Sequence, residues 1–575
     1  MKRKIRLIAI CLLFALSTTT LSGCHKKQTF EEYAESIFLN EITANTLNLH
    51  YTLENPKAYG ITKYDISLGT YSPSGEETAK ALQQMESELL SFSYDSLTRE
   101  EKLTYDLLED FLDTQLQFCK YPLYDEPLSF SNGMQMQLPI LLAEYEFNTE
   151  QDVKDYLELI TLVDEYLKDI IEFEKEKAKA GLFMSDSLCE AVIDSCEAFL
   201  ENQEEHYFLV TFENRVKKLD LSKKKTNAYI KSNEEVFAEE IVPAYENMIK
   251  ELTKLLGSGT NEGGLCNFPD GKKYYELLVY SETGMDDSVE EIWEKIETQR
   301  LKDLLVCADI QETNPSIFDQ IDALEWEMED PDSMLSLLQE NMLSDFPKPP
   351  STDYTIHYVN PALEDYLAPA FYIVAPIDNY TENAIYINDA DQSSDIYYFT
   401  TLAHEGFPGH LYQTVMSYEY KMMPLRSILN YSGFTEGWAT YIEMMSYYYA
   451  GLEDDVASML AHNQAATLSL YATSDIGLHY YGWSASDMYE FWSSFGISNE
   501  EVIEQITQLI LAEPGNYLKY YVGYLGFLEL KDYAKSEFKE NFSTKEFHRA
   551  ILDIGPAPFY IIEDYLEKYY SAPQT

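Results

Sequence analysis

The chain has 575 residues, of which 45% are hydrophobic, and its formal net charge is −58. This length allows one large domain or two domains with a substantial core. Phosphate contacts need clustered lysine and arginine, so a chain this acidic is not expected to have a nucleic-acid partner.

The first 24 residues are typical of a bacterial lipoprotein leader. Four basic residues within positions 2–6 precede a short apolar run at 7–16, which is too short to be a transmembrane helix. Residues 21–24 are Leu-Ser-Gly-Cys, the pattern of a lipobox, so we expect cleavage before Cys24 and lipid on its thiol. The alternative is an ordinary secretory signal. A lipid on Cys24 would anchor the protein to the membrane on its extracytoplasmic face.

The N-terminal half of the chain is predicted to be helical. Apolar residues recur at intervals of three and four through 30–49, 105–118 and 156–173, which indicates amphipathic helices. A glycine-rich stretch at 257–264 marks a loop or a domain boundary. We therefore divide the chain into the leader at 1–24, an N-terminal helical region at 25–265 and a second region at 266–575.

Three short segments in the second region predict a small β-sheet. Residues 354–359, 370–375 and 384–388 are rich in β-branched and aromatic side chains, and each is bounded by proline, asparagine or aspartate. An edge strand of this sheet could pair with an extended peptide, and a purely structural hairpin is an equally good interpretation.

The next predicted helix carries the motif His-Glu-Gly-Phe-Pro-Gly-His at 404–410. Two imidazoles and a carboxylate can hold zinc, while a second carboxylate activates water. In His-Glu-x-x-His both histidines share a helix face, but here Pro408 takes the second histidine's place. Six helical residues turn by about 600°, so a regular helix would point His410 away from His404. Pro408 and Gly409 predict a kink, and spacing alone leaves a metal site and a plain helix end equally open.

Further acidic and histidine residues follow this motif. Glu436 begins the segment Glu-Gly-Trp-Ala and is expected to open another helix, with Glu443 on roughly the same face. Glu443 could orient a metal ligand or face solvent. Asp475 and His479 lie four residues apart, a spacing that on a helix favours a carboxylate–imidazole pair.

These motifs resemble the bacterial domain-of-unknown-function 885 family, which is grouped with zincin-like metallopeptidases. The resemblance rests on His-Glu-x-x-Pro-Gly-His and Glu-Gly-Trp-Ala, with Pro-Asp-Gly at 269–271 and Asp-Ile-Gly-Leu-His at 475–479. It covers most of residues 30–570. Tyr471 and Lys531 stand where the family often has arginine, a departure that concerns substrate contacts more than metal binding.

Helical periodicity and the resemblance together predict a mainly α-helical, large two-lobed zincin-like fold with a small β-sheet beside the active-site helix. The resemblance implies a Zn²⁺ ion held by His404, His410 and Glu436, with an open position for water. Glu405 would take the proton of that water as it attacks a carbonyl carbon.

The oxyanion formed in such a reaction needs a donor, and the C-terminal part offers Tyr520, His548 and His479. We favour Tyr520 and His548, which lie in segments similar to the family, while buried hydrogen-bonding side chains are the open alternative for each.

The expected function is therefore that of a lipid-anchored zinc metallopeptidase acting on a peptide or small amide. A metal-dependent amidase or esterase acting on a small molecule or cell-wall fragment is one alternative. A non-catalytic substrate-binding lipoprotein is another, but such a protein has no need of Glu405 as a base.

Overall fold

The computed structural model describes residues 28–571 apart from Ser74 and residues 204–205, 325–329, 360–363, 365–366 and 389–395. The leader and its predicted lipid site, Cys24, lie outside the described residues. The described residues form two compact units: unit 1 lies within residues 28–262, with 364 and 376–379, and unit 2 lies within residues 263–359, 367–375 and 380–571.

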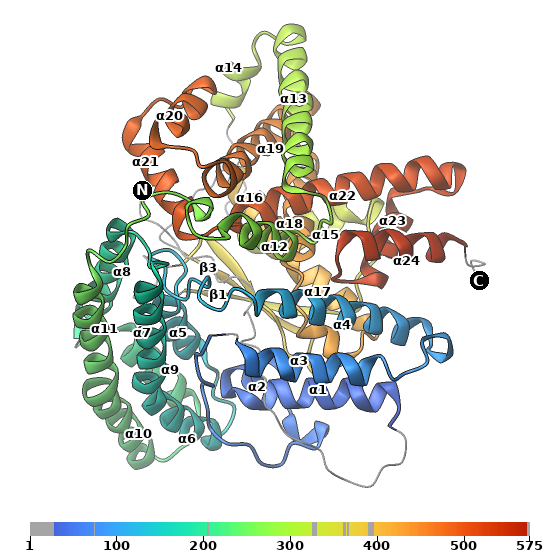
Figure 1. Ribbon diagram of the computed structural model, residues 1–575. Helices are drawn as coiled ribbons and strands as arrows, with labels where there is room; N and C mark the ends of the chain where they lie inside the picture. Colours follow the sequence, from blue (N-terminus) through green and yellow to red (C-terminus); the bar gives the residue numbers. More distant parts are fainter. Residues whose placement is uncertain are drawn as a thin grey trace. The chain divides into compact units, whose positions relative to one another are not determined.

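Unit 1 is helical, as its periodicity predicts (Figure 1). Capping boxes at Thr29, Thr98 and Thr149 satisfy the first backbone N–H groups of three helices, which explains where these helices begin. Tyr156 and Tyr245 are fully buried between helices, so tyrosine serves here as a core residue. The α-helices of this unit are α1 (Phe30–Ala44), α2 (Thr46–Thr52), α3 (Glu76–Leu89), α4 (Arg99–Phe118), α5 (Met134–Glu144), α6 (Glu150–Leu159), α7 (Val163–Ala180), α8 (Asp186–Phe199), α9 (Tyr207–Lys218), α10 (Lys223–Val236) and α11 (Val242–Leu255).

Unit 2 is also mainly helical and contains the small sheet. Its helices are α12 (Gly271–Thr283), α13 (Val289–Thr313), α14 (Ile317–Asp322), α15 (Pro331–Asn341), α16 (Ile396–Glu405), α17 (His410–Glu419), α18 (Ser432–Ser446), α19 (Asp454–Ile476), the π-helix η11 (Gly477–Tyr481), α20 (Ala485–Ser494), α21 (Glu500–Ala512), α22 (Asn516–Phe538), α23 (Thr544–Ile554) and α24 (Phe559–Ser571).

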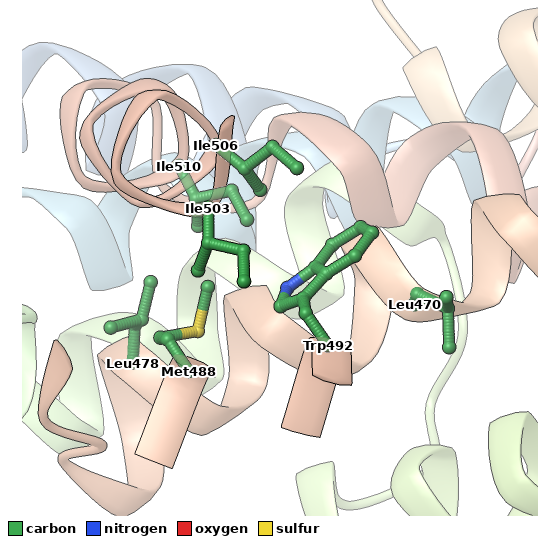
Figure 2. Packing of buried hydrophobic residues seen from close by; sticks show 7 residues of the cluster. All are labelled: Leu470, Leu478, Met488, Trp492, Ile503, Ile506 and Ile510. Atoms are coloured by element: carbon green, nitrogen blue, oxygen red, sulfur yellow. The ribbon is translucent and has the colours of Figure 1, made fainter. Parts of the chain in front are cut away.

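One hydrophobic cluster of unit 2 joins α19 and η11 to the two helices that follow them. Figure 2 shows Trp492 of α20 beside three isoleucines of α21, with Leu478 of η11 and Leu470 of α19 at the sides. The indole nitrogen of Trp492 donates to Ser474 Oγ at 3.0 Å, so its polar atom is satisfied inside the core. This cluster fixes the C-terminal end of α19 against α21.

The predicted sheet is present, with three strands: β1 (Asp353–Tyr358), β2 (Ala370–Ile373) and β3 (Glu382–Ile387). Their order is β1-β3-β2; β3 pairs in parallel with β1 and antiparallel with β2. The outer strand β2 packs against α16. The sheet therefore lies beside the helix that carries His404, as expected.

Helices α18 and α22 approach closely because glycine lines their contact. A Cβ atom on Gly437 would lie 2.4 Å from the backbone of Gly523, and one on Gly523 would lie 2.2 Å from the carbonyl oxygen of Gly433. Such distances exclude any side chain. The glycine of the Glu-Gly-Trp-Ala segment is thus explained by helix packing.

Within the part of the chain that the structure describes, we find no helix with both the length and the apolar character needed to cross a membrane.

Candidate metal centre

A short turn, rather than a kinked helix, separates the two histidines of the motif. Helix α16 ends at Glu405 and α17 begins at His410. The turn between them includes a cis Phe407–Pro408 peptide bond. A Cβ on Gly409 would lie 1.8 Å from the carbonyl oxygen of His404, so only glycine fits there. The two helices change direction at this turn, which brings His410 back towards His404.

The histidine rings meet the carboxylate of Glu436, which comes from α18. Nε2 of His404 and Nε2 of His410 each lie 3.6 Å from Oε2 of Glu436. One ligand atom from each of the three residues lies within 4.8 Å of the others. Zinc bonds of about 2.0–2.2 Å in a tetrahedral arrangement place ligand atoms about 3.3–3.6 Å apart. The two distances to Glu436 match this range, so the donor types and these distances fit a metal ion such as zinc.

Glu443 contacts the other nitrogen of His404. Its Oε1 lies 2.7 Å from Nδ1 of His404, two helical turns along α18 from Glu436. With Nδ1 facing this carboxylate, Nε2, which faces Glu436, is the ring nitrogen available to a metal. Burial disfavours protonation of His404, but without a metal Glu436 and Glu443 outweigh it and raise the pKa of His404 to about 10, so a metal at Nε2 would replace a proton there.

The cluster is rich in negative charge for a buried site. Glu405, Glu436 and Glu443 all lie within 4.0 Å of a nitrogen of His404, and none forms an ion pair with a lysine or arginine among the described residues. Burial raises the pKa of Glu436, but the two histidines hold it well below its usual range. Three buried carboxylates that face two imidazoles leave an excess of negative charge, which is costly unless a cation balances it. This charge balance also favours a bound metal ion.

The remaining motif residue, Glu405, is fixed by the small sheet. Its Oε2 accepts a hydrogen bond from the backbone N–H of Tyr372 in β2 at 3.0 Å. Its Oε1 lies 4.0 Å from Nε2 of His404, the same nitrogen that faces Glu436. Sequence reasoning missed this role of β2, because a backbone N–H leaves no signal in the residue pattern.

Trp438 connects α18 to the turn between the two histidines. Its indole nitrogen donates to the carbonyl oxygen of Pro408 at 2.9 Å. Since Trp438 follows Glu436 by two residues on α18, this bond ties the helix that carries Glu436 to the turn that orients His410.

Asp475 and His479 do not pair with each other, contrary to the helical spacing. Asp475 accepts hydrogen bonds from the Tyr275 hydroxyl at 2.5 Å and from the backbone N–H of Gly515. Burial raises the pKa of Asp475 to about 7, against these bonds. The chain between Asp475 and His479 enters the π-helix η11, which removes the four-residue alignment of an α-helix.

His479 instead bonds to two backbone groups. Its Nδ1 accepts from the N–H of Leu265 at 3.2 Å, and its Nε2 donates to the carbonyl oxygen of Ile510 at 3.0 Å. Burial lowers the pKa of His479 to about 4, so this ring is neutral. Both ring nitrogens are occupied, which is the arrangement of a structural histidine.

The two predicted oxyanion donors lie on different helices. His548 of α23 is fully buried: its Nδ1 bonds the carbonyl oxygen of Asp345 at 2.7 Å, and its Nε2 bonds the Tyr441 hydroxyl at 3.0 Å. Burial lowers its pKa to about 3. Tyr520 is buried on α22, the helix that packs on α18. The oxyanion role of Tyr520 and of His548 stays a prediction.

Comparison with known families identifies the chain. Residues 55–566 match the family described as "Bacterial protein of unknown function (DUF885)". The chain belongs to the DUF885 family. This confirms the resemblance inferred from the motifs, and the family description assigns no activity.

Two solved structures share the fold of this DUF885 protein, and both are described as putative lipoproteins. The one from Colwellia psychrerythraea has a TM-score of 0.79 at 20% identity, with 94% of this chain and 99% of that chain covered. The one from Shewanella oneidensis, described as of unknown function, has a TM-score of 0.62 at 15% identity, with 94% and 100% covered. A comparison with proteins of curated function finds no match.

Proposed function

We propose that this DUF885 protein is a zinc-dependent hydrolase that cleaves peptides outside the cytoplasm. The observation that carries the proposal is the convergence of His404, His410 and Glu436, with Glu405 fixed beside them. A purely structural cluster would have no need of a further buried carboxylate next to the two imidazoles.

The three converging residues would hold the metal, and Glu443 would fix the tautomer of His404. When bound there, zinc lowers the pKa of water and polarises a carbonyl group. Glu405 takes the proton of the attacking water on Oε1, because its Oε2 is occupied by the N–H of Tyr372. The same carboxyl group then gives this proton to the leaving amine. Tyr520 and His548 are our candidates for the oxyanion donor; His548 would have to exchange one of its present bonds, to the carbonyl oxygen of Asp345 or to the Tyr441 hydroxyl.

Localisation at the outer face of the membrane is part of the proposal. It is supported by the Leu-Ser-Gly-Cys segment at 21–24 and by the description of both structural relatives as lipoproteins. Lipid on Cys24 would then hold the enzyme near peptides at the cell surface.

The proposal is tested with Glu405→Gln, which keeps the shape of the side chain but removes its basicity. Purified wild-type protein, loaded with zinc, is assayed on an internally quenched peptide library and on small amide and ester substrates. We expect Glu405→Gln to lose turnover by about 10²–10⁴-fold while it keeps the metal content of the wild type.

The matched control is Glu504→Gln, the same substitution on the exposed face of α21, which should behave as the wild type. Turnover of amides or esters without peptides would favour the amidase or esterase alternative. If Glu405→Gln retained full turnover, or if the wild type bound peptides without cleaving them, the hydrolase proposal would be wrong.

A further inference from the structure

We propose that Tyr372 and Asn383 are positioning residues for Glu405, holding the edge strand whose N–H fixes the orientation of that carboxylate. The inference rests on the proposed function of Glu405 as the base. It assigns to the small sheet a part in the reaction: the sheet decides which carboxylate oxygen is free to accept a proton.

The backbone N–H of Tyr372 points away from the neighbouring strand and towards Glu405. Among the residues that the structure describes, strand β2 has a neighbouring strand, β3, on one side only. The N–H of Tyr372 donates instead to Oε2 of Glu405, at 3.0 Å, inside the protein. Glu405 thus takes the place that a further strand would have at this edge. With Oε2 held, the carboxylate cannot rotate freely, and Oε1 stays on the side of His404.

Strand β2 is itself held in place by the side chain of Tyr372. A strand of four residues with one neighbour has few hydrogen bonds to keep it in place. The side chain of Tyr372 supplies two more: its hydroxyl donates to Oδ1 of Asn383 at 2.7 Å and accepts from the N–H of Ala375 at 3.2 Å. The ring is 5% exposed. Tyr372 is therefore fixed through its side chain as well as its backbone.

The side chain of Asn383 connects all three strands. It lies on β3, and its amide nitrogen donates to the carbonyl oxygens of Tyr380 at 3.0 Å and of Asp353, in β1, at 3.4 Å. Its amide oxygen accepts from Tyr372 of β2. Both N–H groups and the oxygen have partners, so this buried amide is fully satisfied. A leucine at 383 would remove every one of these bonds and leave the Tyr372 hydroxyl without its acceptor.

These contacts separate a positioning role from a purely structural one. If Tyr372 and Asn383 only stabilised the sheet, their loss would lower stability without a specific effect on turnover. If they orient Glu405, their loss lets the carboxylate rotate away from its working position, and a displacement of about 1 Å can lower a rate about 10²-fold. The metal ligands belong to other elements, α16, α17 and α18, and should be unaffected.

The experiment compares Tyr372→Phe and Asn383→Leu with the wild type in the full-length protein. Tyr358→Phe is the matched control, because it removes the hydroxyl of an exposed tyrosine from β1 of the same sheet. Hydrogen exchange at the amide of residue 372 reports the bond to Glu405 without any need for activity. Zinc content, kcat and KM on the internally quenched peptide library report the site.

We expect both variants to exchange the residue 372 amide at least about tenfold faster and to lower kcat about 10–100-fold. Zinc content should equal that of the wild type, KM should change by less than about threefold, and Tyr358→Phe should behave as the wild type. In a Glu405→Asp background, where the shorter side chain cannot reach the Tyr372 N–H, Tyr372→Phe should lower kcat by less than about twofold.

Two results would overturn the inference while the hydrolase proposal stands: exchange at residue 372 that is unchanged in both variants, or kcat values equal to that of an active wild type. An equal loss of kcat in the Glu405→Asp background would likewise reduce Tyr372 to a structural role. A wild type that cleaves no peptide, amide or ester would overturn the proposed function and this inference with it.

Discussion

Unit 2 contains two buried groups of acidic residues and histidines. The two groups have similar residue types, but their side chains contact different partners. Around His404, the carboxylates of Glu436 and Glu443 contact the imidazole itself. Around His479, the ring bonds only backbone groups, and Asp475 bonds Tyr275 and a backbone N–H. The pKa of His404 is raised to about 10, although burial opposes it, whereas burial lowers that of His479 to about 4.

The difference shows how a chemical site can be told from a structural one. Where backbone groups take up the hydrogen-bonding capacity of a polar side chain, that side chain holds elements of the fold together. Where carboxylates and imidazoles are left to one another, charge remains that a cation can balance. By this criterion the cluster at His404 is the candidate metal centre, and the Asp475 and His479 region is a structural junction of α19 and η11.

Among the substitutions that separate the two groups, Gly409→Ala should have the largest effect on zinc content and stability. The added methyl would lie 1.8 Å from the carbonyl oxygen of His404, so the turn between α16 and α17 must open and His410 must move. We expect loss of zinc and a decrease of about 3 kcal/mol in the free energy of unfolding. Zinc content and urea denaturation measure these effects. Gly75→Ala is the control for steric contact, because its φ is −117° and the nearest atom to its Cβ lies at an ordinary 3.8 Å; zinc loss in that variant would contradict the explanation.

Glu443→Gln should weaken zinc binding without removing it. Its carboxylate contacts Nδ1 of His404, and loss of such a partner typically lowers metal affinity about 10–100-fold. Competition with a chromogenic chelator measures the affinity. Asp475→Asn changes the carboxylate of the other group and should leave zinc affinity as in the wild type. Equal weakening in both variants would erase the distinction between the two groups.

The contributions of His479 and Asp475 to stability should change with pH in opposite directions. In the folded protein the pKa of His479 is about 4, below its ordinary value of 6.5. As the pH falls from 6.5 towards 4, the imidazole therefore takes up a proton only in the unfolded chain, and the folded protein loses stability. The folded pKa of Asp475 is about 7, above its ordinary 3.8, so its contribution is lost as the pH rises from 4 to 7.

To test these directions, the free energy of unfolding is measured for the wild type and for a variant at pH 7.5 and at pH 5. The quantity compared between the two pH values is the wild-type value minus the variant value. For His479→Gln we expect this difference to fall by about 2 kcal/mol on going to pH 5. For Asp475→Asn we expect it to rise by about 2 kcal/mol. Changes of the same sign in both variants would contradict the assigned protonation states.

Tyr275→Phe should have the smallest effect. It removes one hydrogen bond to the buried carboxylate of Asp475 and leaves the two contacts with the N–H of Gly515. We expect a loss of about 1–2 kcal/mol in the free energy of unfolding, with zinc content unchanged. A loss of zinc in this variant would show that the two groups are coupled.

Much of the fold was predictable because it depends on local patterns. The periodicity at 105–118 corresponds to the second part of α4, and the segments at 354–359 and 384–388 correspond to β1 and β3 within two residues. The helix of Glu436 begins earlier than expected, at Ser432, where no strong capping residue marks its start.

The candidate site was predictable only in part, since its geometry depends on contacts between distant residues. The residue types and the proline predicted an interrupted helix, but only the turn at Gly409 shows that His410 returns to His404. The pairing of Asp475 with His479 was a wrong prediction, because the partner Tyr275 lies 200 residues away. No residue pattern reveals the backbone N–H of Tyr372 on Glu405.

The most direct test of the account is the zinc content of the purified protein, measured beside His410→Ala, Glu436→Ala and His479→Gln. The account predicts about one zinc per chain, lost in the first two variants and kept in His479→Gln. A wild type that binds no metal, or a His410→Ala variant that keeps all of it, would contradict the assignment of His404, His410 and Glu436 as the metal centre.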